Sequence, residues 1–444
     1  MAFKLFILYL AMVFLRPIEQ FAPDLMALRP MLLLWAATFL SSVAYCKKTG
    51  LFAAHGMQIR MLLLFWLAIV LSLIFNAQWA RITDAIGEFS TPAMLMFLVV
   101  MNVTDLRRFK ITCGVLLWSV FILCLQSIHS YETGYMIETF VIRQVAVENS
   151  VIPQGLTLPS DDVTGVFLWR MRSVGFLQDP NDFSQVICMV IPWLWLGYRE
   201  GAWFMNMIRV VMPAAVMLYA IHLTHSRGGL VGIAVIFAMQ MFRKIGGFWT
   251  SIFALGGAVG MQILSQMGGR GFNAKEASAN ERLDAWFSGI EMFKSHPLFG
   301  VGYGGFMEHH IRTAHNSFVL CFAELGTFGF VCWLSLIVMA VQCVFHVARQ
   351  GGGEKQWLGW MMCSSLGAFL ACAWFLSRTY QASLFMLFGL CYACYFVVKR
   401  DDFITEGRGA KMPRPDLPAR WLGVTLACYA VSMIGVSFFV RAAK

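Results

Sequence analysis

Apolar runs of membrane-spanning length recur along nearly the whole chain, and this pattern limits the fold more than any other feature. A helix that crosses a bilayer needs about 20 mainly apolar residues. Of the 444 residues, 59% are hydrophobic and only 13% are charged, which is not the composition of a soluble protein of this size. The candidate spans lie at 2–15, 30–46, 61–77, 90–103, 111–128, 183–198, 206–223, 229–242, 247–265, 317–346, 357–377, 380–397 and 421–440. We therefore expect an all-α fold, a polytopic helical membrane protein with about 12 or 13 transmembrane helices.

The spacing of these runs predicts one integral membrane domain over 1–444, without a separate soluble domain. Its parts are an outer loop at 129–182, core membrane helices at 183–265, a large outer loop with amphipathic helices at 266–316, and C-terminal membrane helices at 317–444. The first apolar run is followed by Arg16-Pro17 rather than by a small-residue cleavage site, so we expect a retained anchor.

Lys and Arg residues in the short loops fall on alternate turns, which predicts that they share the cytoplasmic side if every span crosses. They are Lys4, Lys47–Lys48, Arg107–Arg108, Lys110, Arg199, Arg209, Arg243–Lys244, Arg349, Lys355 and Lys399–Arg400. The net charge of +10 is then mostly a topology signal. Basic and aromatic residues do not interleave, so we predict no nucleic-acid partner. Both long loops and the turns at 225–229 and 377–380 fall on the outer face.

The 12 cysteines lie in or at the edge of apolar runs, where a free thiol behaves as a small hydrophobe. Cys391-Tyr-Ala-Cys394 has the spacing of a redox or metal motif. Because this motif lies inside an apolar span, we favour a structural role.

The first polar motif on the outer face is Gln178-Asp-Pro-Asn-Asp182. Asp179 followed by Pro180 is typical of a helix start, with a carboxylate at the N-cap and proline in the first turn. The free N–H groups of that end and Arg172 upstream could bind an anion. The alternative is that Asp179 and Asp182 satisfy the helix end and that one of them pairs with Arg172.

The second motif is His225-Ser-Arg-Gly-Gly229, between two apolar spans. Paired glycines permit a sharp turn and close approach to a ligand. Arg227 lies at the membrane edge, where snorkelling into headgroups is the alternative to a functional role.

The third motif is the long outer loop. Ser278-Ala-Asn-Glu281 has the spacing of a capping box and predicts a helix start, with Arg282 in the first turn. Leu283, Trp286, Ile290 and Phe293 form an apolar face, typical of an interfacial helix. The helix is expected to end before His296-Pro297. The turn at 300–305 is glycine-rich and expected to be flexible, but it lacks the Lys-Ser/Thr pair of a nucleotide loop.

The fourth motif is Thr313-Ala-His-Asn-Ser317, where the apolar sequence resumes. Nearby arginines would keep His315 neutral, and a neutral imidazole can accept a proton from an attacking hydroxyl. His309 and His310 are assigned to the loop surface, and the spacing of these histidines does not favour a metal site. Glu324 lies inside an apolar run and indicates either a functional group or a helix break at 325–329.

Four segments in this order resemble the O-antigen ligase and O-antigen polymerase superfamily of polytopic glycosyltransferases. They are GFLQDPNDFS, HSRGG, ERLDAWFSGIEMFKSHPLFGVGYGGF and AHNSFV. The resemblance covers about 165–335, and the flanking spans match only in hydropathy.

This resemblance implies a transferase of the bacterial inner (cytoplasmic) membrane that acts at the periplasmic face without cofactor, metal or nucleotide sugar. Its partners are the lipid bilayer, a glycan donor on undecaprenyl pyrophosphate, and a lipid, glycan or protein acceptor. Carried over by motif, Arg227 and Arg282 contact the pyrophosphate and His315 serves the acceptor hydroxyl or the leaving group. These three are the predicted catalytic residues. The predicted substrate-binding residues are Arg172, Asn181, Gly228 and Asn316.

The chemistry of the motifs fits this assignment. Guanidinium groups stay protonated and bind phosphate oxygens in pairs, so they stabilise a departing pyrophosphate. Without a covalent nucleophile or a glycosidase-like carboxylate pair, we expect direct displacement with inversion. Two alternatives stay open. One is a polymerase of lipid-linked repeat units; the other is a polysaccharide transporter or flippase, which the outer-edge position of most charges disfavours.

Overall fold

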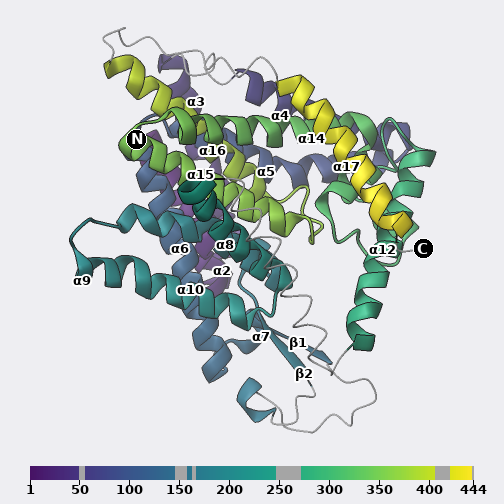
Figure 1. Ribbon diagram of the computed structural model, residues 1–444, viewed down its shortest axis with the longest axis horizontal. Coiled ribbons are helices and arrows are strands. Elements are labelled where there is room, and N and C mark those ends of the chain that lie inside the picture. The colour runs from purple at the N-terminus through teal and green to yellow at the C-terminus, as the bar shows by residue number, and fades with distance from the viewer. Residues whose placement is uncertain (50–55, 146–157, 163–166, 247–271, 406–420, 443–444) are drawn as a thin grey trace. The chain divides into compact units, whose positions relative to one another are not determined.

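The computed structural model of the protein describes residues 1–49, 56–145, 158–162, 167–246, 272–405 and 421–442 (Figure 1). These residues are almost entirely helical, apart from one two-stranded antiparallel sheet. The predicted all-α polytopic class is therefore confirmed. The predicted span at 247–265 lies outside the described residues.

Two long series of helices flank the sheet in the chain. Before it lie α1 (Ala2–Leu15), α2 (Pro17–Phe21), η1 (Pro23–Leu28), α3 (Pro30–Thr49), α4 (Gly56–Phe75), η3 (Trp79–Arg81), α5 (Ile82–Asn102), α6 (Leu106–Thr133) and α7 (Ile137–Phe140). The sheet holds β1 (Val141–Val145) and β2 (Phe167–Met171), with η4 (Pro159–Asp161) between them. After it come η5 (Gly175–Leu177), α8 (Pro180–Val190), η6 (Ile191–Gly197), α9 (Trp203–Asn206), η7 (Met207–Val211), α10 (Met212–Leu223) and a helix over Arg227–Gly246. The last helices are α12 (Phe272–Ser295), α13 (Phe306–His309), α14 (Ser317–Gln350), α15 (Gly353–Ala373), α16 (Ala382–Thr405) and α17 (Trp421–Ala442).

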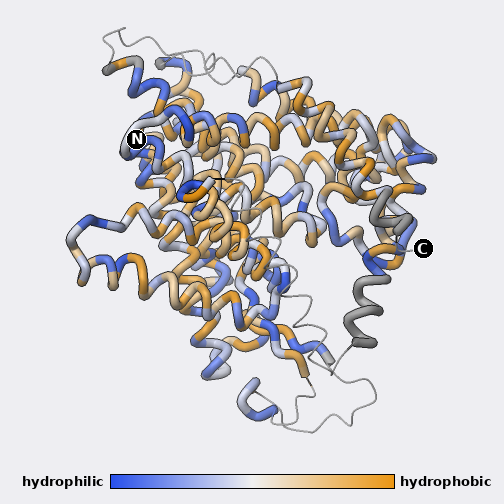
Figure 2. The backbone as a smooth tube through the Cα atoms, viewed as in Figure 1, coloured by the Kyte–Doolittle hydropathy of each residue, from blue (hydrophilic) through white to orange (hydrophobic). Residues whose placement is uncertain are grey.

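Eight of these helices are long and apolar enough to cross a membrane. They lie at Pro30–Lys48, Gly56–Phe75, Trp79–Asn102, Leu106–Thr133, Trp203–Leu223, Arg227–Gly246, Ser317–Gln350 and Ala382–Asp402, and shorter apolar helices lie at Ala2–Leu15 and Trp421–Ser437. Hydrophobic residues dominate the long helices, whereas hydrophilic ones gather at helix ends and in connecting segments (Figure 2). The number of transmembrane helices predicted from hydropathy stays a prediction, because part of the chain is not described.

One predicted span differs from the observed structure. The apolar run at 183–198 is not one helix, because α8 ends at Val190 and a 3-10 helix, η6, follows. Pro192 lies at the start of η6 and has no backbone N–H to donate, so it cannot continue the α-helical ladder.

The chain divides into two compact units. The first unit contains 1–50, 101–234 and 364–372, and the second contains 51–100, 235–363 and 373–444. In the first, α1 packs on α3 and α6, and α6 also packs on α8 and α10. In the second, α14 is the central element and packs against α4, α12, α16 and α17. Whether the chain acts as the single domain predicted from the sequence stays a prediction.

The strand pair was not predicted. It lies within the segment expected to be an outer loop at 129–182, where Val141 pairs with Met171 and Val145 pairs with Phe167. A buried face supports it, because Val141, Trp169 and Met171 are all at most 5% exposed. The hairpin follows α7 directly, and the backbone N–H of Arg172 extends the pairing to the carbonyl of Phe140 at 2.7 Å.

Candidate functional site

The N-terminus of α8 forms as the sequence predicts. Asp179 is the N-cap, its carboxylate accepts the backbone N–H of Asn181 at 2.7 Å, and Pro180 occupies the first turn. The cap satisfies one of the free N–H groups of the helix end. Asp182 lies in the same turn and is buried.

Arg170, which the sequence analysis did not select, connects this helix end to the HSRGG region. Its Nε donates to the carbonyl of Thr224 at 3.0 Å, and its Nη2 donates to the side-chain oxygen of Asn181 at 2.9 Å. Burial lowers the pKa of the Arg170 guanidinium, and the nearby charge of Asp179 acts in the opposite direction. Arg170 therefore joins the end of α10 to the start of α8. Its position on a strand was the missing signal, since β2 was not predicted.

Arg172 has a different environment from the one predicted. Its Nε donates to the carbonyl of Thr139 at 3.0 Å and its Nη2 donates to the carbonyl of Glu138 at 2.6 Å. Neither of these partners is Asp179 or Asp182, the two carboxylates considered from the sequence. Arg172 thus holds the base of the hairpin against α7, and its proposed contact with substrate stays a prediction.

The HSRGG motif is a helix start that follows a left-handed turn. His225 has φ of 49°, and Gly229 N–H donates to the hydroxyl of Ser226 at 3.3 Å, so Ser226 caps the helix Arg227–Gly246. Partial burial, His222 and Arg170 lower the pKa of His225. Arg227 is exposed and, within the described residues, its guanidinium makes no hydrogen bond or ion pair.

Gly229 of this motif serves helix packing rather than the turn. A side chain at Gly229 would meet the Ser184 hydroxyl at 1.9 Å, so only glycine lets this helix approach α8 so closely. The carbonyl of Gly228 accepts from the Cys372 thiol at 3.1 Å, and Gly228 is buried. The turn itself is made by His225. The expectation that the paired glycines make the sharp turn is therefore corrected. Binding of substrate by Gly228 stays a prediction.

In the second unit, α12 differs from the predicted helix. It begins at Phe272, so Ser278-Ala-Asn-Glu281 lies inside the helix and is not a capping box. The reason is that the residues before Ser278 include Ala274, Lys275, Glu276 and Ala277, which are good helix formers. Arg282 accordingly lies in the middle of the helix and not in its first turn. The predicted end is confirmed, since α12 stops at Ser295.

The structure brings Arg282 and His315 to the same region of this unit. The indole N–H of Trp286 donates to the carbonyl of Ala314 at 3.0 Å, and Trp286 is 8% exposed. Arg282 lies one helical turn before Trp286, on the same face of α12, and His315 follows Ala314 directly. A side chain at Gly289 would lie 2.6 Å from Val319, so α12 packs closely on the start of α14.

His315 and Asn316 directly precede α14, which begins at Ser317, where the predicted apolar span begins. His315 has φ of 47°, and the side-chain oxygen of Asn316 caps the helix by accepting the N–H groups of Phe318 at 2.9 Å and Val319 at 3.2 Å. Asn316 is fully buried, and its Nδ2 has no hydrogen-bond partner among the described residues. A buried amide donor without an acceptor is unfavourable, which makes Nδ2 a candidate for contact with a ligand.

A second segment borders this helix start. Ser317 donates its hydroxyl to the carbonyl of Leu376 at 2.5 Å and accepts the backbone N–H of Arg378 at 2.9 Å. Thr379 donates its hydroxyl to the carbonyl of Ser317 at 2.7 Å. These bonds fix the turn at 377–380, which the sequence placed on the outer face, beside the start of α14.

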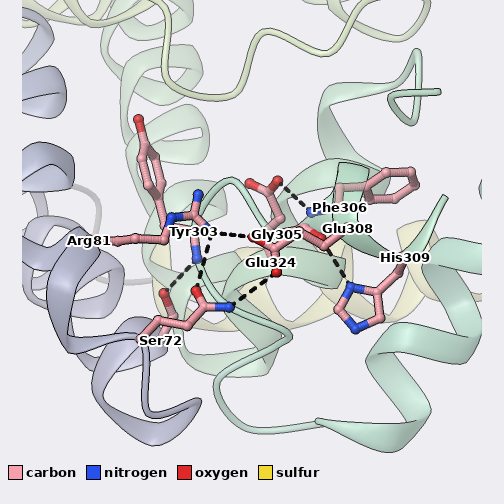
Figure 3. Close-up of polar contacts among 9 residues, drawn as sticks. Ser72, Arg81, Tyr303, Gly305, Phe306, Glu308, His309 and Glu324 are labelled. Atoms are coloured by element: carbon pink, nitrogen blue, oxygen red, sulfur yellow. Dashed lines mark hydrogen bonds and ion pairs between the residues drawn. The ribbon is translucent and has the colours of Figure 1, made fainter. Parts of the chain in front are cut away.

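Glu324 belongs to a structural network. Its carboxylate accepts a hydrogen bond from the Tyr380 hydroxyl at 2.8 Å. It also accepts one from the Phe306 N–H at 3.3 Å (Figure 3). The helix break predicted at 325–329 is confirmed, because Gly326 has a non-helical conformation with φ of 61°. A buried carboxylate with two donors beside a kink indicates a structural role at this position.

The glycine-rich turn at 300–305 docks on this kink. Val301 N–H donates to Ala323 and Gly302 N–H donates to Glu324, both at 3.0 Å. Gly300 has φ of 67°, and a side chain there would lie 2.3 Å from the backbone of Glu324. Close backbone packing explains the glycine, and the flexibility predicted for this turn stays a prediction. Nearby, Arg81 pairs with Glu308 at 2.7 Å (Figure 3).

The remaining polar candidates have simpler environments. His309 and His310 lie at the surface of the loop, as expected. Cys391 and Cys394 are buried in α16 and carry free thiols. Within the described ranges, three or more potential ligands do not gather to hold a metal ion.

The helices and the polar groups at their ends define a multi-pass helical membrane protein. Residues 212–334 match the model of the O-antigen ligase family. The match confirms the resemblance predicted from the motifs, and it includes Arg227, Arg282 and His315. The Gln178–Asp182 motif lies before it. A comparison with curated proteins finds no match. In general terms, the family indicates an O-antigen ligase or polymerase type of membrane glycosyltransferase.

Proposed function

We propose that this protein transfers a glycan from undecaprenyl pyrophosphate to an acceptor hydroxyl at the periplasmic face of the bacterial inner membrane. The observation that carries the proposal is the family match over 212–334, which includes three of the four motifs. The reaction is a direct displacement at the anomeric carbon: the acceptor oxygen forms the new bond, the bond to the pyrophosphate oxygen breaks, and the configuration inverts.

Arg227 is the proposed contact for the pyrophosphate in the first unit. The exposed guanidinium at the first turn of the helix Arg227–Gly246 makes no hydrogen bond or ion pair within the described part of the chain. A guanidinium at a helix N-terminus suits a phosphate, because the helix end adds a partial positive charge. Arg170 and Asn181 support this role by joining the preceding turn to the start of α8.

Arg282 and His315 are the proposed catalytic residues of the second unit. The Trp286–Ala314 hydrogen bond supports their joint action, because it ties the helix of Arg282 to the backbone beside His315. Arg282 stabilises the departing pyrophosphate, and His315 takes the proton of the acceptor hydroxyl or serves the leaving group. The unpartnered Nδ2 of Asn316 is the proposed donor to a substrate oxygen.

Reconstitution in proteoliposomes with a synthetic lipid-pyrophosphate glycan tests this function. Release of lipid pyrophosphate together with a single transfer to an added lipid acceptor supports the ligase. A ladder of lengthening products identifies a polymerase of lipid-linked repeat units instead. Movement of intact labelled donor across the membrane, without release of lipid pyrophosphate under any acceptor, would overturn the transferase assignment in favour of a transporter.

A further inference from the structure

A groove of about 580 Å³ opens in the first unit, between the N-terminal ends of α1 and α6. Phe3, Lys4 and Ile7 line it from α1. Asp105, Arg107, Arg108 and Ile111 line it from α6. The groove lies outside the segment that matches the ligase family and contains none of the proposed transferase residues.

Two cations of this groove have no protein partner in the described part of the chain. Lys4 and Arg107 are both exposed, and neither makes a hydrogen bond or an ion pair there. Arg108 differs, because its guanidinium lies 3.2 Å from the Asp105 carboxylate and donates to the Tyr45 hydroxyl at 3.2 Å. The groove therefore offers two positive charges that are available to a ligand.

The carboxylate in the groove does not oppose an anion strongly. Asp105 is the N-cap of α6, where it accepts the N–H of Arg108 at 2.9 Å, and it also pairs with that guanidinium. Its charge is thus balanced locally. The starts of α1 and α6 add the partial positive charge of two helix ends.

Apolar side chains also line the groove. Phe3 and Ile7 lie one turn apart on α1, and Ile111 lies one turn after Arg107 on α6. Ile111 is 38% exposed. A ligand that fits therefore combines an anionic group with an apolar tail.

We propose that this groove binds an anionic phospholipid, with its phosphate at Lys4 and Arg107 and an acyl chain along Phe3, Ile7 and Ile111. The positive-inside distribution predicts that this end of both helices faces the cytoplasm, where basic sites between helices take anionic lipid headgroups. A zwitterionic headgroup fits less well, because its own cation would face the same two positive side chains. The lipid site is independent of the glycosyl transfer proposed above.

Native mass spectrometry of the full chain, purified and loaded with phosphatidylglycerol or phosphatidylcholine, tests the site. The variant carries Lys4→Ala and Arg107→Ala. The control carries Lys47→Ala and Lys48→Ala, which removes the same charge from exposed residues at the end of α3, outside the groove. We expect the groove variant to bind phosphatidylglycerol about 25-fold more weakly, or about 5-fold for each charge. Thermal unfolding of both variants checks that they fold alike.

Preference of the wild type for phosphatidylglycerol, lost in the groove variant and kept in the control, supports the site. If both variants lost phosphatidylglycerol binding equally, the binding would reflect only the general surface potential, and the proposed site would be overturned. Retention of phosphatidylglycerol by the groove variant, or displacement of the lipid by millimolar inorganic phosphate, would also overturn it. These outcomes do not depend on transferase activity, so they are distinguishable from a failure of the proposed function.

Discussion

The guanidinium of Arg170 donates a hydrogen bond to the side-chain oxygen of Asn181, with 2.9 Å between Nη2 and Oδ1. The same side chain binds the carbonyl of Thr224 at 3.0 Å. One half-buried arginine therefore joins the start of α8 to the residue that precedes the turn carrying Arg227. The position of the proposed pyrophosphate contact depends on this link.

Replacement of Arg170 by alanine is expected to destabilise the protein by about 2–4 kcal/mol, because two charge-assisted hydrogen bonds of a partly buried group are lost. The rate of glycan transfer should also fall by about 10-fold or more, because Arg170 no longer fixes the turn before Arg227. Arg170→Lys should recover only part of both losses, because lysine cannot fill two sites at fixed geometry. Thermal unfolding and transfer rates measure these effects. Arg143→Ala, at an exposed arginine of the same hairpin, is the control, and an equal loss there would refute a specific role for Arg170.

The imidazole of His225 should be neutral at pH 7. Burial, His222 and Arg170 all lower its pKa below the ordinary value of about 6.5. Because the folded pKa is depressed, the unfolded chain binds protons first as the pH falls, so His225 costs stability below pH 6.5 and not above it. An NMR titration of labelled histidine should show this low pKa, and Arg170→Ala should shift it upward. A pKa above 6.5 in the wild type would contradict the assigned environment.

The indole N–H of Trp286 should matter for transfer and little for folding. Trp286→Phe keeps an aromatic ring beside Trp374 but removes the hydrogen bond to Ala314. A single hydrogen bond contributes about 1 kcal/mol, so the rate should fall about 5-fold. Trp203→Phe, at a residue that is 73% exposed, is the matched control. Wild-type transfer by Trp286→Phe would show that this bond does not align Arg282 with His315.

Gly300 should tolerate no side chain. Gly300→Ala combines a left-handed φ of 67° with a clash against the backbone of Glu324, so we expect a loss of about 1–3 kcal/mol or more. Gly352→Ala, where nothing lies within 4 Å of the added carbon, should be nearly neutral. The midpoints of thermal unfolding in detergent compare the two. Equal midpoints would contradict the docking of the glycine-rich turn on the Gly326 kink.

Local chemistry predicted the ends of several elements correctly. The Asp179-Pro180 pair predicted the start of α8, because capping depends on a few neighbouring residues. The return of apolar sequence at 317 predicted the start of α14. The break at Gly326 was also predicted, since glycine permits the required conformation.

Features that depend on distant partners were not predictable in this way. Arg170 and Arg172 look alike in the sequence, and only the β1–β2 pairing gives Arg170 its contacts with Asn181 and Thr224. Gly229 suggested a sharp turn and Gly300 a flexible one, yet their neighbours are Ser184 and Glu324, far away in the chain. Packing between separate elements decided these cases.

The proposed pyrophosphate contacts are tested most directly by two variants, Arg227→Ala and Arg282→Ala. The measurement is the initial rate at which each variant releases lipid pyrophosphate in proteoliposomes. Removal of a preorganised cation from the leaving group should slow release by about 100-fold or more. Two control variants should keep the wild-type rate. Arg143→Ala lies in the same hairpin as Arg170, and Lys294→Ala lies on the same helix as Arg282. Wild-type release by Arg227→Ala or Arg282→Ala, in protein with unchanged thermal unfolding, would contradict the proposed pyrophosphate contacts.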